Sequence, residues 1–371
     1  MIEGKRRGAS RALKGGAAIG TICLACSVLD NLDDLSSGPL GQGGDEPSAG
    51  AAGASAGGSA EAGAGGFGAG TSGSGGLAGS DAGGSGSVAG ASGSGGLAGS
   101  DAGGSGATRL YWLERGSKTV NAANMDGGQP APLITLSGAA GSGMTGIAVD
   151  ALGSGIYFTD SQRKRVQRIN LDGSSLLNLM PGIEAPSGID LDPSTGKFYV
   201  ALQGSAPGVQ RVNLDGASPE PLITTGLQHP VGLALDVAGG KLYFVDDNLD
   251  AIFCAALDGS NLTNLNIAGV DGPIDISLDT LEHKIYWSEL GAPGARIRRA
   301  NLDGSGVEDI VTPSTAPGFS TPQGLEVDVA GRALYFVDGG ANGSILRAQL
   351  DGSGPAPVLT SLNEPTGLTI R

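Results

Sequence analysis

The chain has 371 residues, 69 of them glycine, and a formal net charge of −15. Glycine at this level is far above ordinary usage, and it is concentrated between Ser36 and Gly106, so only residues 107–371 have the composition to bury a core. Those residues carry 17 Lys and Arg against 28 Asp and Glu, a net charge of −11. This balance argues against nucleic acid as a partner, because binding to phosphates needs a basic face.

Residues 1–26 have the pattern of an export signal. Basic residues between Lys5 and Lys14 precede the apolar stretch GGAAIGTICLA, which is too short to span a bilayer. Leu24-Ala25-Cys26 follows and resembles the cleavage site of bacterial lipoproteins, except that Cys23 stands where leucine is usual. This resemblance implies a lipid-modified Cys26 as the mature N-terminus, with Ser27 favouring the outer membrane. The alternative is ordinary secretion to the periplasm or the exterior.

Residues 27–106 are predicted to be a disordered tether. They consist mainly of Gly, Ala and Ser, and SGSGGLAGSDAGGSG occurs twice without change. No apolar period is present, so burial cannot offset the entropy cost of ordering the segment. As a flexible coil, such a tether would have a mean reach on the order of 45 Å.

Residues 107–371 contain a repeat with a period in the forties. Six tyrosines recur at spacings of 46, 42, 44, 43 and 49 residues: Tyr111, Tyr157, Tyr199, Tyr243, Tyr286 and Tyr335. Each unit has a run such as PIDISLD, a run such as KIYWSE, a run ending in a turn such as NLDG, and a weaker apolar run. Four short strands separated by Asp-Gly and Pro-Gly turns predict one antiparallel sheet per unit.

These signals predict an all-β fold, a six-bladed β-propeller of four-stranded antiparallel blades. The repeats begin at a second run, Leu110–Glu114, and the chain ends on a first run, Pro365–Ile370. The C-terminal strand is therefore expected to complete the first blade and close the ring without a free edge.

The repeat residues also resemble a known family. Y-W/F-x-D/E followed by R-x-N-L-D-G is similar to the YWTD repeat, the class B repeat of LDL-receptor-type proteins, over about 260 residues. The resemblance implies a six-bladed propeller that binds protein ligands or acts as a spacer. The epidermal-growth-factor-like modules that flank such propellers in receptors are absent, and the repeat KFYVAL departs from the pattern.

Most repeated residues have a structural interpretation. The aromatic pairs are expected to fill the space between adjacent blades, and Asp160, Asp246 and Asp338 to bond backbone amides of their own blade. Cys254 lies in the apolar run AIFCAAL without a neighbouring base, so we expect a buried, unreactive thiol.

Acidic residues on the innermost strands are one candidate site. Strand alternation places Asp190 and Glu326 toward the central channel, and Asp275 replaces a repeat glycine beside them. Oxygen ligands converging on an axis could hold one divalent cation such as Ca²⁺. The alternative function is then a metal-dependent hydrolase similar to gluconolactonase, although the Glu-Gly-Pro start and the Asn ligand of that family are missing.

Loops at one mouth of the channel are the other candidate site. Residues that precede the first strands vary between blades and are expected to rim this mouth: Glu184, His229, Asp271 and Glu364. The preferred hypothesis is an exported, lipid-anchored propeller that binds a protein or glycan ligand there without catalysis. Its only membrane contact would be the lipid anchor.

Overall fold

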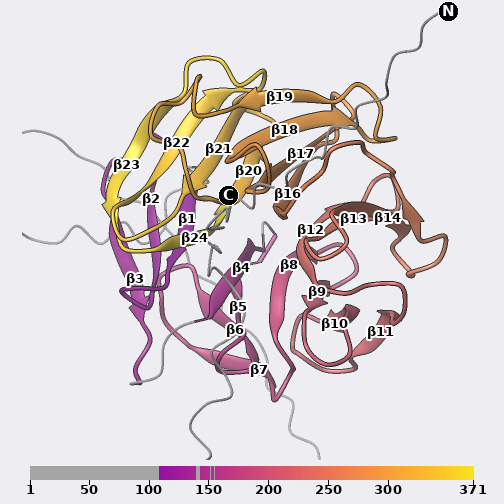
Figure 1. The fold of residues 1–371 in the computed structure, drawn as a ribbon. Helices are drawn as coiled ribbons and strands as arrows, with labels where there is room; N and C mark the ends of the chain where they lie inside the picture. The colour runs from indigo at the N-terminus through magenta and orange to yellow at the C-terminus, as the bar shows by residue number, and fades with distance from the viewer. Residues whose placement is uncertain (1–107, 139–142, 151, 154) are drawn as a thin grey trace, which may run out of the picture. The chain divides into compact units, whose positions relative to one another are not determined.

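A computed structural model describes residues 108–138, 143–150, 152–153 and 155–371. The predicted signal at 1–26 and tether at 27–106 lie outside the described residues. The described residues form 24 strands arranged in six four-stranded sheets around a ring (Figure 1). The part of the chain that the structure describes contains no helix with the length and apolarity to cross a membrane.

Each sheet is one blade, with its first strand nearest the axis of the ring and its last strand at the outer edge. Blade 1 contains β24 (Pro365–Ile370), β1 (Arg109–Glu114), β2 (Thr119–Asn124) and β3 (Ala131–Thr135). Blade 2 contains β4 (Met144–Val149), β5 (Gly155–Asp160), β6 (Arg165–Asn170) and β7 (Leu177–Pro181). Blade 3 contains β8 (Pro186–Asp192), β9 (Lys197–Leu202), β10 (Gly208–Asn213) and β11 (Glu220–Ile223).

The second half of the ring repeats this order. Blade 4 contains β12 (Pro230–Asp236), β13 (Lys241–Asp246), β14 (Ala251–Ala256) and β15 (Thr263–Asn264). Blade 5 contains β16 (Pro273–Asp279), β17 (Lys284–Glu289), β18 (Arg296–Asn301) and β19 (Glu308–Val311). Blade 6 contains β20 (Pro322–Asp328), β21 (Ala333–Asp338), β22 (Gly343–Gln349) and β23 (Ala356–Leu362).

The C-terminal strand closes the ring as the repeat order predicts. β24 pairs antiparallel with β1, with Leu110 opposite Ile370 and Trp112 opposite Leu368. The Arg109 N–H also donates to the Arg371 carbonyl at 2.7 Å. The first blade is therefore assembled from both ends of the repeat region, and this antiparallel pairing covers the edge that β1 would otherwise expose.

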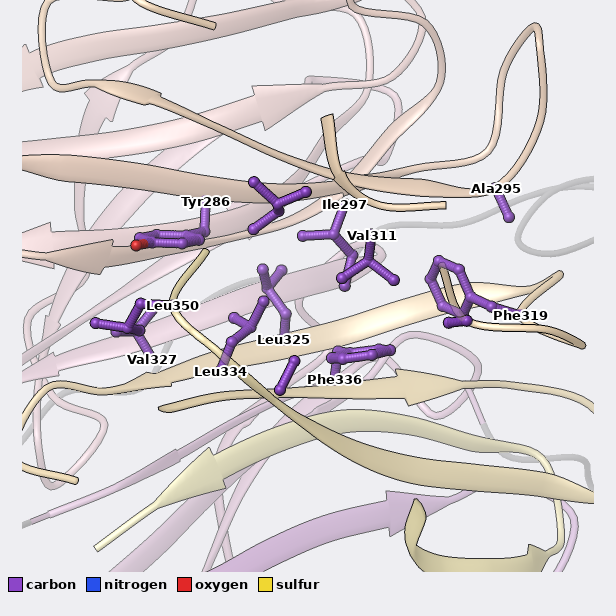
Figure 2. Packing of buried hydrophobic residues seen from close by; sticks show 13 residues of the cluster. Tyr286, Ala295, Ile297, Val311, Phe319, Leu325, Val327, Leu334, Phe336 and Leu350 are labelled. Carbon is purple, nitrogen blue, oxygen red and sulfur yellow. The ribbon is translucent and has the colours of Figure 1, made fainter. Parts of the chain in front are cut away.

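The core lies between blades, in six clusters of buried residues. Each cluster joins the repeat tyrosine of one blade to the second strand of the next. Figure 2 shows the cluster between blades 5 and 6, where Tyr286 and Ile297 lie on one side of the gap between the sheets and Leu334 and Phe336 on the other. The predicted role of the aromatic pairs is confirmed. Cys254 is also buried, and burial raises the pKa of its thiol, as expected for an unreactive cysteine.

The strand directions give the ring two different ends. At one end lie the connections that lead into each inner strand and the loops between second and third strands. We call this end the loop face. At the other end, the turn face, lie the Asp-Gly turns, such as the one in which Asp172 accepts from the Ser174 N–H at 2.9 Å and Gly173 has a φ of 81°.

Candidate functional site

The inner strands of neighbouring blades approach each other closely around the axis of the ring. A Cβ atom on Gly188 of β8 would lie 2.3 Å from the Val231 carbonyl oxygen of β12, so a side chain at this position requires the strands to move apart. Five inner strands have glycine here, and β16 has Asp275 instead. Asp275, which stands in place of the repeat glycine, therefore changes the close contact between the inner strands of neighbouring blades.

Asp275 reaches the backbone of the following blade. Its Oδ2 accepts from the Leu325 N–H of β20 at 3.0 Å. Its other oxygen, Oδ1, lies against Gly232 of β12, 2.5 Å from where a Cβ would be. Asp275 thus contacts the inner strands on both sides of its own, and the small residue at Gly232 makes room for it.

Asp190 makes a similar bond two residues further along its strand. Its Oδ2 accepts from the Leu235 N–H of β12 at 2.8 Å, and its Oδ1 accepts from the N–H of Leu191 at 2.7 Å. Ser277 occupies the same repeat position in blade 5, and its Oγ accepts from the Val327 N–H of β20 at 3.1 Å. Asp190 and Ser277 therefore satisfy backbone N–H groups of the next inner strand, which that strand's own sheet does not pair.

The environment near the axis favours the neutral form of all three acidic side chains. Burial raises the pKa of Asp190 to about 6, against the lowering effect of its two backbone hydrogen bonds. Burial likewise raises the pKa of Asp275 to about 7, with a further contribution from Asp190. The pKa of Glu326 lies well above its usual value because of burial and then the charges of Asp190 and Asp275. The three carboxyl groups therefore influence one another across the ring.

The hydrogen bonds of these residues decide whether a divalent cation fits among them. No three His, Cys, Asp or Glu side chains in the described ranges are grouped so that they could hold a metal ion. Both oxygens of Asp190 and the Oδ2 of Asp275 already accept backbone N–H bonds. A hard cation needs six or more oxygen ligands, so the residues present do not form a prepared Ca²⁺ site.

The four rim residues lie at the loop face, but each belongs to the connection into a different blade. Glu184 pairs with Lys164 at 3.1 Å, and both side chains are more than half exposed. His229 Nδ1 lies 2.6 Å from Asp247 Oδ1, and Asp271 Oδ2 accepts from the Ala292 N–H at 2.7 Å. The Glu364 N–H donates to the Gly340 carbonyl. The structure spreads these residues around the rim and does not gather them into one cluster.

Acidic residues at the ends of the second strands fix the connections of this face. Asp246, which is fully buried, accepts from the N–H groups of Gln228, His229 and Leu249 at 2.8–3.2 Å. Asp338 accepts from the Thr321 N–H at 2.8 Å, and Asp160 from the Gly143 N–H at 3.2 Å. The predicted structural role of these aspartates is confirmed.

Blade 3 lacks two features that the other blades share. Leu202 stands opposite the first proline of β8, where blades 4, 5 and 6 have Asp246, Glu289 and Asp338. Val200 stands where the other second strands have Phe or Trp. A groove of about 550 Å³ opens beside Leu202, lined by Leu179, Met180, Ile183, Leu202 and Gln210 among others, whereas Val200 is fully buried and is not part of the lining. The repeat pattern did not predict this groove, although its signal, the irregular repeat KFYVAL, was visible.

Comparisons with known proteins agree with the resemblance that the repeat residues indicate. The low-density lipoprotein receptor-related protein 5 of Mus musculus is 31% identical over 182 residues, which cover 48% of this chain and 11% of that protein. The vitellogenin receptor of Solenopsis invicta is 27% identical over 151 residues, which cover 41% of this chain and 8% of that protein. This chain thus spans about a tenth of the length of these curated relatives.

A solved structure has the same fold. A chain of the nidogen/laminin complex superposes with a TM-score of 0.61 at 20% identity, over 71% of this chain and 98% of that chain. No protein-family model matches the chain. The six described blades and the solved structure show a six-bladed β-propeller fold. Its repeats are similar to those of the receptor-related proteins, in agreement with the resemblance to the YWTD, or LDL-receptor class B, repeat.

Proposed function

We propose that the protein is an exported, non-catalytic binding protein whose propeller holds a protein ligand at the loop face. The observation that carries this proposal is the arrangement of varied, polar residues on short connections at one end of a rigid ring, with Glu184, His229, Asp271 and Glu364 on four different blades. Loops on a rigid scaffold are where binding specificity is generally placed. The relatives are named as a receptor and a receptor-related protein, which agrees with ligand binding.

A protein ligand fits the described surface better than a glycan. Sugar rings are commonly recognised by stacking on exposed aromatic side chains. All Trp, Tyr and Phe side chains in the described ranges are buried, including Trp112 and Trp287. The loop face instead offers carboxylates, amides and backbone groups, which suit polar contacts with another polypeptide.

The N-terminal segment would deliver this propeller to the cell exterior or the periplasm. We propose residues 1–26 as the export signal, Cys26 as the lipid attachment site, and residues 27–106 as a tether. The composition of these segments supports the proposal. Mass spectrometry of the mature protein from a membrane fraction tests it. An N-terminal peptide beginning at an acylated Cys26 is expected, whereas an unmodified N-terminus elsewhere excludes the anchor.

The face of binding is tested by photo-crosslinking with the full chain in its native cells. A photoreactive amino acid is introduced at Asn248, which is exposed between β13 and β14 at the loop face. In a second variant it is introduced at Ser260, which is exposed between β14 and β15 at the turn face of the same blade. We expect a discrete protein adduct from position 248 and none from position 260. Equal adducts from both positions, or none from either, contradict binding at the loop face.

A further inference from the structure

The two strands that close the ring carry like charges where other blades carry opposite charges. The inner strands of blades 2 to 6 end in, or are followed by, an aspartate: Asp150, Asp192, Asp236, Asp279 and Asp328. In blades 3, 4 and 5 this aspartate lies opposite a lysine of the second strand: Lys197, Lys241 and Lys284. In blade 1 the inner strand β24 is followed by Arg371, which stands at the position of the aspartate.

Arg371 lies directly opposite Arg109, the first residue of β1. The Arg109 N–H donates to the Arg371 carbonyl at 2.7 Å, and the Arg371 N–H donates to the Arg109 carbonyl at 3.1 Å. Like charges directly opposite each other on antiparallel strands are destabilising. A negative charge bound beside these two side chains would therefore stabilise the closure of the ring.

The described chain does not supply that negative charge. Within the described ranges, the side chains of Arg109 and Arg371 make no hydrogen bond and no ion pair. The Nε atom of Arg109 is buried without an acceptor. By contrast, Arg211 pairs with Glu220 at 2.7 Å. A buried donor without an acceptor costs free energy, so an acceptor bound from outside is favoured here.

Tyr111 is a third donor on the same face of blade 1. Strand alternation places it on the face of Arg109, and Thr369, which lies opposite Tyr111, on the face of Arg371. The Tyr111 side chain is 3% exposed, and its hydroxyl makes no hydrogen bond within the described part of the chain. In blade 3 the Tyr199 hydroxyl donates to a carbonyl of the next blade at 3.1 Å.

The charges around Tyr111 differ from those around the other repeat tyrosines. Burial raises the pKa of each of the six, and in blades 2 to 6 the inner-strand aspartate raises it further. For Tyr111, burial raises the pKa, whereas the charges of Arg109 and then Arg371 lower it. The two arginines thus act on the Tyr111 hydroxyl, in the place that a carboxylate takes in the other blades.

We infer that Tyr111, Arg109 and Arg371 form a binding site for a phosphate group at the turn face of blade 1. The hydroxyl and the two guanidinium groups are all donors, and no acceptor of the described residues meets them. The forked guanidinium group matches the oxygen atoms of a phosphate, and two positive charges suit a doubly charged anion better than a carboxylate. The site lies at the opposite end of the ring from the loop face, so the inference goes beyond the proposed function and does not depend on it.

Isothermal titration calorimetry of the full chain with inorganic phosphate tests the inference, with sodium chloride keeping the ionic strength constant. We expect one saturable site per chain. Acetate, a singly charged carboxylate, should bind at least about tenfold more weakly because it offers fewer charge-assisted hydrogen bonds. Glycerol phosphate is the second probe: tighter binding than inorganic phosphate assigns the group to a larger molecule, and weaker binding assigns it to the free ion.

Three variants locate the binding. Arg371→Asp restores the aspartate of the other blades opposite Arg109, so it should abolish phosphate binding without lowering the melting temperature. Tyr111→Phe removes one donor and should weaken binding by about threefold to tenfold. Arg332→Asp is the matched control, because it changes the net charge equally at the turn face and Arg332 pairs only with the exposed Glu282. It should retain the binding of the unaltered chain.

The inference is overturned if the unaltered chain shows no saturable binding of phosphate. Equal affinities for phosphate and acetate would also overturn it, since they would indicate general attraction of anions. Undiminished binding by Arg371→Asp, or an equal loss in Arg371→Asp and Arg332→Asp, would place the anion elsewhere on the molecule. None of these results bears on the crosslink at Asn248, which tests the loop face separately.

Discussion

The junctions between blades 2 and 3 and between blades 5 and 6 are built on the same repeat, yet one is open and the other is filled. In the second, Phe336 and Phe319 occupy the space between the sheets (Figure 2). Asp338 caps the connection there by accepting from the Thr321 N–H. In the first, Val200 and Leu202 replace the aromatic and the acid, and Leu202, but not the fully buried Val200, lines a groove. The comparison teaches that a repeat can lose its aromatic and its acid without changing the strand order, and that a groove can lie beside it.

Truncating a buried side chain should lower the free energy of unfolding more at the filled junction than at the open one. Phe336 is 1% exposed, so Phe336→Ala is expected to lower the free energy of unfolding by about 3–5 kcal/mol through lost burial and a cavity. Val200→Ala should cost less, about 1–2 kcal/mol, because fewer buried carbons are removed. Urea unfolding followed by tryptophan fluorescence measures both, and equal losses would show that the two junctions are packed alike.

Transferring the leucine of blade 3 into blade 4 tests the capping role of the acid. Asp246→Leu leaves the N–H groups of Gln228, His229 and Leu249 without their buried acceptor. We expect a loss of about 2–4 kcal/mol in the free energy of unfolding. Glu282→Ala is the control, because Glu282 is exposed and pairs only with an exposed Arg332, and it should cost at most about 0.5 kcal/mol. If both variants lose the same amount, the cap is not what stabilises these connections.

Acidic side chains near the axis should make the propeller more stable in mild acid than in base. The folded protein raises the pKa of Asp190 to about 6 and that of Asp275 to about 7, both above the usual 3.8. Ionisation is therefore harder in the folded state, and stability falls as the pH rises from about 4 through 7. Since both side chains keep some solvent contact, we expect a difference of about 1–3 kcal/mol between pH 5 and pH 8.

The matched variant for this pH dependence is Asp190→Asn combined with Asp275→Asn. An asparagine carbonyl can still accept from the Leu235 and Leu325 N–H groups, but it does not ionise. Urea unfolding across this pH range should show a smaller slope for the double variant. An unchanged slope would mean that other groups carry the pH dependence.

The sequence predicted the ring and its closure because the same signals occur in every blade. Asp246 and Asp338 could be assigned as structural for the same reason. The bond from Leu235 to Asp190 could not be predicted, because it depends on the separation of inner strands in different blades. The groove was also missed: KFYVAL shows that Leu202 replaces the acid of the other repeats, but only the fold shows that Leu202 lines a groove together with the short connection at 182–185.

The smallest expected effect is also the sharpest test of the comparison. Leu202→Asp restores to blade 3 the acid found in the other blades, next to Ala185, the residue before the first proline of β8. In blade 4 the equivalent residue, His229, donates its N–H to Asp246 at 3.0 Å. A new cap should offset the lost burial of leucine, so we expect the free energy of unfolding to change by less than about 1 kcal/mol. A loss similar to that of Asp246→Leu would mean that blade 3 has adapted to leucine beyond this one position.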